Sequence, residues 1–433
     1  MTPASRIQAS IELISSVISQ TYPADTIITH YFRSNRYIGS KDRRQVSSYT
    51  YGCLRHYFQL QWGLGKHSTP RLLVFLFVLL EDKWQLHDLQ NACDSNPYHP
   101  QPLSTKESAT LKKALARLKG PLPPDVELNI PAWSLGLFQE AFGDTHALEV
   151  ESLSESASFD LRVNTLKTTR DAVMKSLDED NIPGIPTPLS PLGVRLAERR
   201  PLPAHPLWRN GWVEVQDEGS QLVSLLVGAK PQETVLDLCA GAGGKTLALG
   251  ATMLNKGHIV AMDISEKRLE RARERLRRAG VHNTEFRAID AAGQRWLARQ
   301  SKRFDRVLID APCSGSGTWR RNPDLKLRFQ ESDLEEIMGK QAYLLAQAIP
   351  LIRPGGYLIY VTCSLFTCEN QQQIADFLEK NAEFTAVPMA QVWEENLGTP
   401  YPSANPLYLQ LTPHQHNCDG FFMAVLRKMA PVA

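Results

Sequence analysis

The sequence predicts an α/β protein whose larger part is a mostly parallel, doubly wound sheet, preceded by a bundle of short helices. From Trp212 onward, apolar stretches of strand length alternate with helical patterns, which is typical of a parallel sheet with helices on both faces. A glycine cluster follows the first of these strands, and doubly wound sheets bind ligands at that edge. Residues 1–120 instead carry apolar residues at helical spacing, which predicts a separate helical part.

The composition is that of an intracellular globular protein. Its 433 residues suggest about two to four domains. With 48 basic and 46 acidic residues the net charge is only +2, so any basic surface must be local. Seven cysteines are too few, and odd in number, for a disulfide scaffold. The longest apolar run, Leu72 to Leu80, is too short to cross a membrane. We therefore expect a cytoplasmic monomer without membrane contact.

The first 125 residues are predicted to form a helical domain. Apolar residues share one helical face near the N-terminus, and further helices are expected over residues 43–61, 72–80 and 106–119. The run from Gly120 to Pro124 ends this pattern, which places a boundary near residue 125.

Residues 126–210 are predicted to form a small α/β module that joins two larger parts. Phe159 to Asn164 is typical of a strand and Thr168 to Asp178 of a helix, whereas residues 182–206 are rich in proline.

Residues 211–433 supply the doubly wound sheet. Short apolar runs predict strands over residues 234–238, 258–263, 285–290, 304–310, 357–363 and 421–426. Helices are expected between them over residues 246–253, 266–279 and 333–352. The last of these is expected to end before Pro354.

The glycine cluster after the first strand reads DLCAGAGGKT. A P-loop would need a glycine where Cys239 stands, and a dinucleotide fingerprint would need one where Thr246 stands. A loop that binds the amino-acid end of S-adenosyl-L-methionine fits better. Because glycines let a ligand approach the backbone, the candidate cofactor-binding residues are Cys239, Ala240, Gly241, Ala242, Gly243, Gly244 and Lys245.

Three acids follow successive strands of this sheet. Asp263 ends the second strand, where a carboxylate can accept hydrogen bonds from ribose hydroxyls. Asp290 follows the third strand, where it can accept from an adenine amino group, and Asp310 follows the fourth. Any one of them alone could be a helix cap or a surface acid. Together they predict the rim of a ligand site.

Two cysteines stand at strand ends beside this loop, Cys313 in DAPCSGSG and Cys363 in VTCS. A zinc site would be expected to show CxxC spacing, which the sequence lacks, so we predict no metal. Beside a methyl donor, a thiolate that adds to C6 of cytosine makes C5 nucleophilic, which is covalent catalysis. A second group must then remove the C5 proton, and a carboxylate near N3 would stabilise the adduct.

The motifs DLCAGAGGKT, DAPCSGSGTWRRNPD, TCS and DGFF, with the upstream VQDEGSQL and RVNTLKTTR, resemble the Fmu/Sun-type RNA 5-methylcytosine methyltransferases of the RsmB/NOP family. The resemblance covers residues 160–430 and implies a class I, Rossmann-like methyltransferase domain. It implies that Cys363 is the nucleophile and that Cys313 assists product release. It also implies that Asp263, Asp290 and Asp310 are ligand acids. The family loop usually reads CAAPGGK, whereas this chain has CAGAGGK.

The N-terminal helices resemble, more weakly, a NusB-like RNA-binding domain, through KDRR at Lys41 and YGCLR at Tyr51. Residues 160–205 would then correspond to a small RRM-like module. We expect RNA contacts from a few aromatic and basic residues that follow Cys313 or lie on the helical domain. These residues are Trp319, Arg320, Arg321, Lys326, Arg43, Arg44 and Arg55.

The sequence thus predicts an S-adenosylmethionine-dependent enzyme that forms 5-methylcytosine in RNA, with 16S ribosomal RNA as the expected substrate. Cys363, Cys313 and Asp310 are the expected catalytic residues. The same chemistry on tRNA is one alternative. A P-loop NTPase with an RNA-binding domain is another, and the cysteine at position 239 counts against it.

Overall fold

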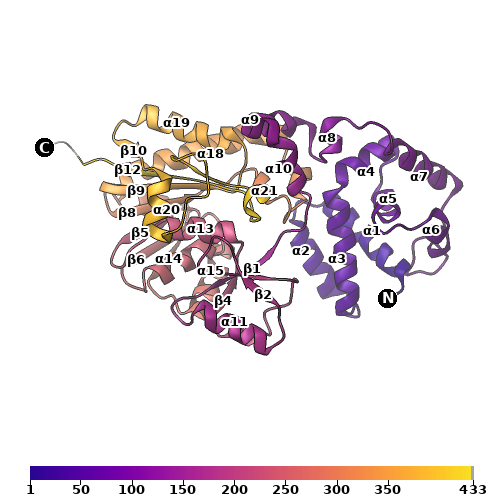
Figure 1. Ribbon diagram of the computed structural model, residues 1–433, viewed down its shortest axis with the longest axis horizontal. Helices are drawn as coiled ribbons and strands as arrows, with labels where there is room; N and C mark the ends of the chain where they lie inside the picture. Colours follow the sequence, from indigo (N-terminus) through magenta and orange to yellow (C-terminus); the bar gives the residue numbers. More distant parts are fainter. Residues whose placement is uncertain (431–433) are drawn as a thin grey trace. The chain divides into compact units, whose positions relative to one another are not determined.

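The computed structural model describes residues 1–430, and its contacts divide the chain into two compact units (Figure 1). The helical unit comprises Met1–Ser156 and, from far along the chain, Trp319–Glu331. The catalytic unit comprises Ala157–Thr318 and the described residues from Ser332 onward. The division of the sequence into residues 1–125, 126–210 and 211–433 stays a prediction.

The helical unit is built around one helix that is apolar on almost all sides. This helix, α5 (Pro70–Glu81), contacts α1 (Pro3–Ser19), α3 (Ser40–Arg55), α4 (Tyr57–Leu64) and α7 (Thr105–Arg117). Because neighbours surround it, all residues from Leu72 to Leu79 are buried, as expected for such a helix. The other helices are α2 (Ala24–Ser34), α6 (Leu86–Ala92), α8 (Pro124–Glu127), α9 (Leu135–Phe142), α10 (His146–Ser152) and α17 (Leu325–Arg328).

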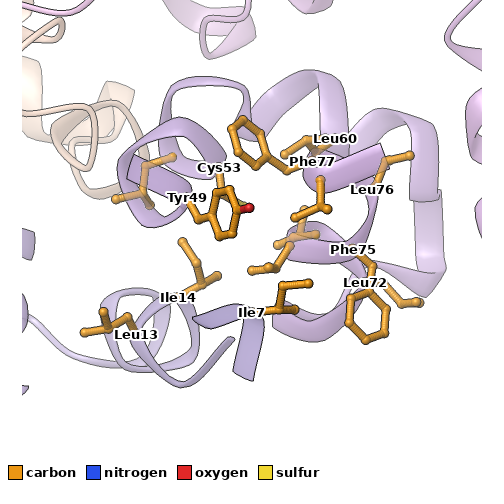
Figure 2. Close-up of a cluster of buried hydrophobic side chains, with 14 of the residues drawn as sticks. Ile7, Leu13, Ile14, Tyr49, Cys53, Leu60, Leu72, Phe75, Leu76 and Phe77 are labelled. Atoms are coloured by element: carbon orange, nitrogen blue, oxygen red, sulfur yellow. The ribbon is translucent and has the colours of Figure 1, made fainter. Parts of the chain in front are cut away.

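Close packing of α3 on α5 explains one of the motifs in the helical region. Figure 2 shows Tyr49 and Cys53 of α3 beside Phe77 of α5. A Cβ atom on Gly52 would lie 2.2 Å from the Phe77 ring, so the glycine permits this approach. The prediction of one helix over residues 43–61 was wrong, because the chain leaves helical geometry at His56 and forms α3 and α4.

The distant segment Trp319–Glu331 is part of the helical core. Trp319 is fully buried and its ring lies 5.7 Å from that of Phe138. Lys326 is 1% exposed, and its Nζ donates to the backbone carbonyls of Arg55 at 3.2 Å and Asn129 at 3.1 Å. Burial, and next the charge of Arg55, lower the pKa of Lys326 to about 7.

The expectation that the residues after Cys313 contact RNA is wrong for the buried ones. Trp319, Arg320 and Lys326 are all buried, so none presents a surface to RNA. The sequence suggested that these residues form a loop beside the active site, whereas the segment Trp319–Glu331 packs in the core of the helical unit.

The catalytic unit begins with a four-stranded antiparallel sheet in the order β2-β3-β1-β4. Its strands are β1 (Phe159–Val163), β2 (Gly184–Pro186), β3 (Gly193–Leu196) and β4 (Val213–Val215). The helix α11 (Arg170–Glu179) packs on it through Val173 and Leu177, and α12 (Pro206–Arg209) adds Leu207 to the same core. The predicted strand at Phe159 and the predicted helix after Thr168 are confirmed.

The main sheet has the order β10-β12-β9-β8-β5-β6-β7, with β11 paired to β12. Strands β5 to β9 are parallel, and β10, β11 and β12 are joined by antiparallel pairs. The bounds are β5 (Thr234–Asp237), β6 (His258–Asp263), β7 (Thr284–Ala288), β8 (Phe304–Asp310), β9 (Ile352–Thr362), β10 (Phe384–Ala386), β11 (Leu409–Leu411) and β12 (Phe421–Lys428). All six predicted strands are confirmed.

Helices cover both faces of this sheet (Figure 1). One face carries α13 (Glu218–Leu226), α14 (Gly244–Thr252), α15 (Glu266–Ala279) and α20 (Met389–Leu397). The other carries α16 (Ala291–Ala298), α18 (Glu331–Ala348) and α19 (Gln371–Lys380). A four-residue helix, α21 (Pro413–His416), lies between β11 and β12. The expected end of α18 was wrong, because Pro350 already ends the helix and β9 begins at Ile352.

The strand order places a topological switch point at β5. The chain runs outward from β5 to β6 and β7, and then returns to form β8 on the other side of β5. Ligands of doubly wound sheets bind outside the carboxyl ends of the strands at such a point. A ligand site is therefore expected at the carboxyl ends of β5, β6 and β8.

Candidate active site

A cavity of about 650 Å³ lies at this switch point. Its lining includes Leu238 after β5, Asp263 at the end of β6, Ile289 after β7 and Asp310 at the end of β8. Residues at or just after the ends of four successive parallel strands thus contribute to one site. A pocket of this size is in the range of small-molecule and cofactor sites.

The glycine loop forms one wall of the cavity. Six of the seven predicted loop residues line it, namely Cys239, Ala240, Gly241, Ala242, Gly244 and Lys245. Gly241 has φ +55°, and a Cβ atom there would meet nothing within 4 Å, so its backbone faces open space. Gly243 has φ +78° and packs away from the cavity, where a Cβ would lie 2.7 Å from the Cβ of Ala272. Gly243 therefore sets the approach of α14 to α15.

The three predicted acids have different surroundings. Asp263 is buried, and its two carboxylate oxygens accept backbone N–H bonds from Gly241 at 2.9 Å and Ser265 at 2.8 Å. Asp290 is exposed and caps α16 by accepting from the Gly293 N–H at 2.7 Å. It is not among the residues that line the cavity, although its neighbour Ile289 is.

Asp310 forms a partly buried ion pair with Lys245 at the cavity wall, with Nζ 2.6 Å from Oδ2. Burial opposes the charged form of Lys245, but the carboxylate of Asp310 outweighs it and the pKa of Lys245 is raised. A Cys363 thiolate would be a further contributor in the same direction. A permanent positive charge therefore stands near Cys363.

The two predicted cysteines come together although they are fifty residues apart in the sequence. Their Sγ atoms lie 3.4 Å apart, with Cys313 after β8 and Cys363 after β9. These neighbouring strands pair in parallel, with Asp310 opposite Val361, so both cysteines leave the sheet at the same edge. The hydrogen bond with Cys363 and then burial raise the pKa of Cys313 well above its ordinary value.

Backbone contacts join the loops that follow these strands. The N–H of Gly317 donates to the carbonyl of Cys363 at 2.9 Å, and the N–H of Gly420 donates to the carbonyl of Gly317 at 2.8 Å. A Cβ on Gly317 would lie 2.5 Å from the Gly420 carbonyl oxygen, so the SGSG and DGFF motifs need their glycines for this contact.

Sequence reasoning missed several residues of the site. Glu369 is fully buried and bonds to the residues that follow both cysteines. Five residues of α18 also line the cavity, namely Ile337, Lys340, Tyr343, Leu344 and Gln347. Asp237 is buried with a pKa raised to about 7 by burial. The acid within the apolar and hydroxyl-rich run after Cys363 was the available signal for Glu369.

Within residues 1–430, no three His, Cys, Asp or Glu side chains gather as ligands of a metal ion would. In the same residues, no helix is long and apolar enough to cross a membrane.

Comparison with known proteins gives two family matches. Residues 224–427 match the family described as 16S rRNA methyltransferase RsmB/F. Residues 130–203 match the ferredoxin-like domain of RsmF/B-like methyltransferases.

Individual relatives match along almost the whole chain. The ribosomal RNA small subunit methyltransferase B of Yersinia enterocolitica is 31% identical over 439 residues, covering 96% of each chain. The protein of the same name from Salmonella paratyphi B is 30% identical over 414 residues, covering 90% of this chain and 92% of the relative.

Solved structures agree with these relatives. The crystal structure of PH0851 aligns over 99% of each chain with a TM-score of 0.79 and 26% identity. A methyltransferase homolog protein from Pyrococcus horikoshii covers 71% of this chain and 100% of its own, with a TM-score of 0.60 and 28% identity.

Proposed function

Because the chain belongs to the RsmB/F family of 16S rRNA methyltransferases, we propose that it methylates C5 of a cytosine in 16S rRNA through a covalent adduct with Cys363. The enzyme is an S-adenosyl-L-methionine-dependent rRNA methyltransferase, and its catalytic unit has the predicted Rossmann-like fold. Family membership removes the basis for the P-loop NTPase alternative. The choice of cytosine C5 is supported by the paired cysteines.

The cavity fits S-adenosylmethionine. The open backbone at Gly241 allows close approach of the amino-acid end. Each carboxylate oxygen of Asp263 accepts one N–H and retains a lone pair for a ribose hydroxyl. When bound, the cofactor supplies an electrophilic methyl group. Asp290 would reach the adenine only by giving up or sharing its helix cap, whereas Ile289 already lines the cavity.

The charges around the two cysteines favour Cys363 as the nucleophile. The Lys245 ammonium lies close enough to Cys363 to interact with a negative charge on its sulfur, and a thiolate is the reactive form of cysteine. The Cys363 sulfur would add to C6 of the cytosine, and the electron pair at C5 would then attack the methyl group. After the C5 proton leaves to a water molecule that the Cys313 thiol positions, the C6–S bond breaks and the thiolate returns. Asp310, at the cavity wall, would stabilise the adduct near N3.

The separation of 3.4 Å between the two sulfurs is the observation that carries this proposal. Substituting Cys363→Ala removes the attacking sulfur, so turnover should stop and no adduct should form. Substituting Cys313→Ala should permit attack and methylation but slow the loss of the C5 proton. The variant should then accumulate a covalent RNA adduct that survives denaturing electrophoresis.

The double variant Cys313→Ala/Cys363→Ala is the control and should show no adduct. If Cys363→Ala accumulates the adduct and Cys313→Ala does not, the two roles are reversed. If both single variants keep full activity, covalent catalysis at cytosine is wrong for this enzyme.

The helical unit is proposed to supply RNA affinity. Its exposed basic residues, including Arg33, Arg36, Lys41 and Arg44, are suited to phosphate contacts. Two residues of the expected basic cluster serve the fold as well, since Arg43 donates to the Ile38 carbonyl at 2.8 Å and Arg55 donates to the Arg320 carbonyl at 3.3 Å. We also propose that the chain acts as a monomer.

A further inference from the structure

One buried acid of the catalytic unit has no part in the mechanism above. Glu369 ends a short 3-10 helix, Thr367–Glu369, that follows β9, and its side chain has no solvent exposure. A buried carboxylate is costly unless its oxygens are hydrogen-bonded. The groups that bond to it therefore indicate what it does.

Four donors surround this carboxylate. Oε1 accepts from the backbone N–H of Ser314 at 2.8 Å and from Gln341 Nε2 at 3.0 Å. Oε2 accepts from Ser314 Oγ at 2.5 Å and from Ser364 Oγ. All four donors are neutral groups, and an ionised carboxylate can accept from all of them at once. The negative charge thus stays unneutralised by these contacts.

Two of these partners are the residues next to the cysteines. Ser314 follows Cys313 and Ser364 follows Cys363, so a single carboxylate ties the two loops together; we call these contacts the Glu369 bridge. The hydroxyls of Ser314 and Ser364 also lie 3.2 Å apart. The Glu369 bridge therefore fixes the separation of the two sulfur atoms from one side.

The two cysteines also face charges of opposite sign. The negative charge of Glu369 acts on Cys313, whose pKa is raised first by Cys363, then by burial, and also by Glu369. Cys363 faces the Lys245 ammonium, which is itself paired with Asp310. Tyr360, whose hydroxyl donates to the Glu369 carbonyl at 2.7 Å, is a further titratable group that interacts with Cys313.

We propose that Glu369 is a positioning residue that holds the two cysteine loops together and, through its negative charge, keeps Cys313 as a thiol while Cys363 attacks the cytosine. This inference rests on the proposed function, because it explains why two adjacent cysteines take different roles. Like charges disfavour a second ionisation nearby. Glu369 and Lys245 thus act in opposite directions on the two sulfurs.

The charge effect can be tested without RNA. In a Cys363→Ala background, the rate of alkylation of Cys313 by iodoacetamide is measured against pH by mass spectrometry of the Cys313 peptide. Adding Glu369→Gln should move the midpoint of this profile down by about one pH unit or more, because a nearby negative charge is removed. Gln341→Ala is the matched control, since it removes one donor but keeps the charge, and its midpoint should not move.

The positioning effect is tested in the Cys313→Ala background, where the RNA adduct accumulates. Ser314→Ala and Ser364→Ala each keep the carboxylate but remove part of the Glu369 bridge. Each should slow adduct formation several-fold without moving the alkylation midpoint. These serine variants decide the positioning role even if Glu369→Gln does not fold, and circular dichroism checks the fold of each variant.

An unchanged midpoint in folded Glu369→Gln would overturn the charge effect, and unchanged adduct rates in both serine variants would overturn the positioning role. Failure of the proposed function has a different signature. It would appear as absence of adduct in Cys313→Ala with Glu369 intact, while the alkylation midpoint would still respond to Glu369→Gln.

Discussion

At the scale of single residues, the site combines buried groups whose charge states depend on one another. Asp237 at the end of β5 is fully buried, and burial raises its pKa from 3.8 to about 7. Thr246 donates to its Oδ2 at 2.7 Å, whereas Oδ1 has no hydrogen-bond partner among the described residues. The folded state thus holds a proton on Asp237 that the unfolded chain releases near pH 4.

This proton makes stability fall as pH rises. Between the unfolded pKa of 3.8 and the folded value of about 7, the folded protein binds more protons than the unfolded chain. The slope of unfolding free energy against pH is therefore negative in this window. The contribution is fully present below pH 3.8 and is lost as pH approaches 7, by about 4 kcal/mol at most.

We predict that Asp237→Asn is more stable, relative to the parent, at pH 8 than at pH 5. The amide stays neutral, so the variant lacks the loss of stability that ionisation causes, and its Oδ1 can still accept from Thr246. Melting temperatures across this pH range provide the measurement. A difference between variant and parent that does not change with pH would show that Asp237 ionises normally.

At the scale of elements, the segment Trp319–Glu331, which follows Cys313 in the sequence, packs in the core of the helical unit. Trp319, six residues after Cys313, is fully buried against Phe138. The same segment also bonds to the backbone of α2, since the Asp324 carboxylate accepts from the Ala24 N–H at 3.1 Å. Deleting residues 1–120 would remove part of the cover of this segment. Such a truncation would therefore disturb more than RNA affinity.

We predict that Trp319→Ala lowers the free energy of unfolding by about 3–5 kcal/mol, because a large buried aromatic is removed. Trp133→Ala is the control, since Trp133 is only half-buried in the same unit, and it should cost less. Urea denaturation monitored by circular dichroism compares the two. Equal losses of unfolding free energy in the two variants would mean that Trp319 stabilises the core no more than Trp133 does.

At the scale of the whole molecule, the near-neutral charge implies that RNA affinity depends on a few exposed cations. Arg33, Arg36 and Arg44 are exposed on the helical unit, and each phosphate contact releases counterions from RNA. Point substitutions test them without exposing the core.

We predict that the triple variant Arg33→Ala/Arg36→Ala/Arg44→Ala binds a 16S rRNA fragment more weakly. The slope of log affinity against log salt should become shallower by about 2–3. Lys112→Ala/Lys113→Ala, which changes exposed cations on α7, is the matched control and should keep the parent slope. If the triple variant also keeps the parent slope, the helical unit has another task.

The sequence alone determined the parts of this enzyme that depend on local pattern. Strands such as His258–Asp263 and the helix Glu266–Ala279 were predicted at their observed bounds, because apolar periodicity is a local property of the chain. Parallel strands all end at one edge of the sheet, and for this reason two of the three predicted acids, Asp263 and Asp310, line one cavity, whereas Asp290 caps α16.

Only the tertiary structure decided which distant residues meet. Neither the burial of Trp319 and Lys326 in the helical unit nor the four donors around Glu369 follows from periodicity. A buried lysine and an exposed one have the same place in a sequence pattern, because burial depends on what packs over the side chain. The charges that distinguish Cys313 from Cys363 come from residues brought to the sulfurs by the fold. The roles of the two cysteines therefore depend on which residues lie near their sulfur atoms in three dimensions, not on which residues are near in the sequence.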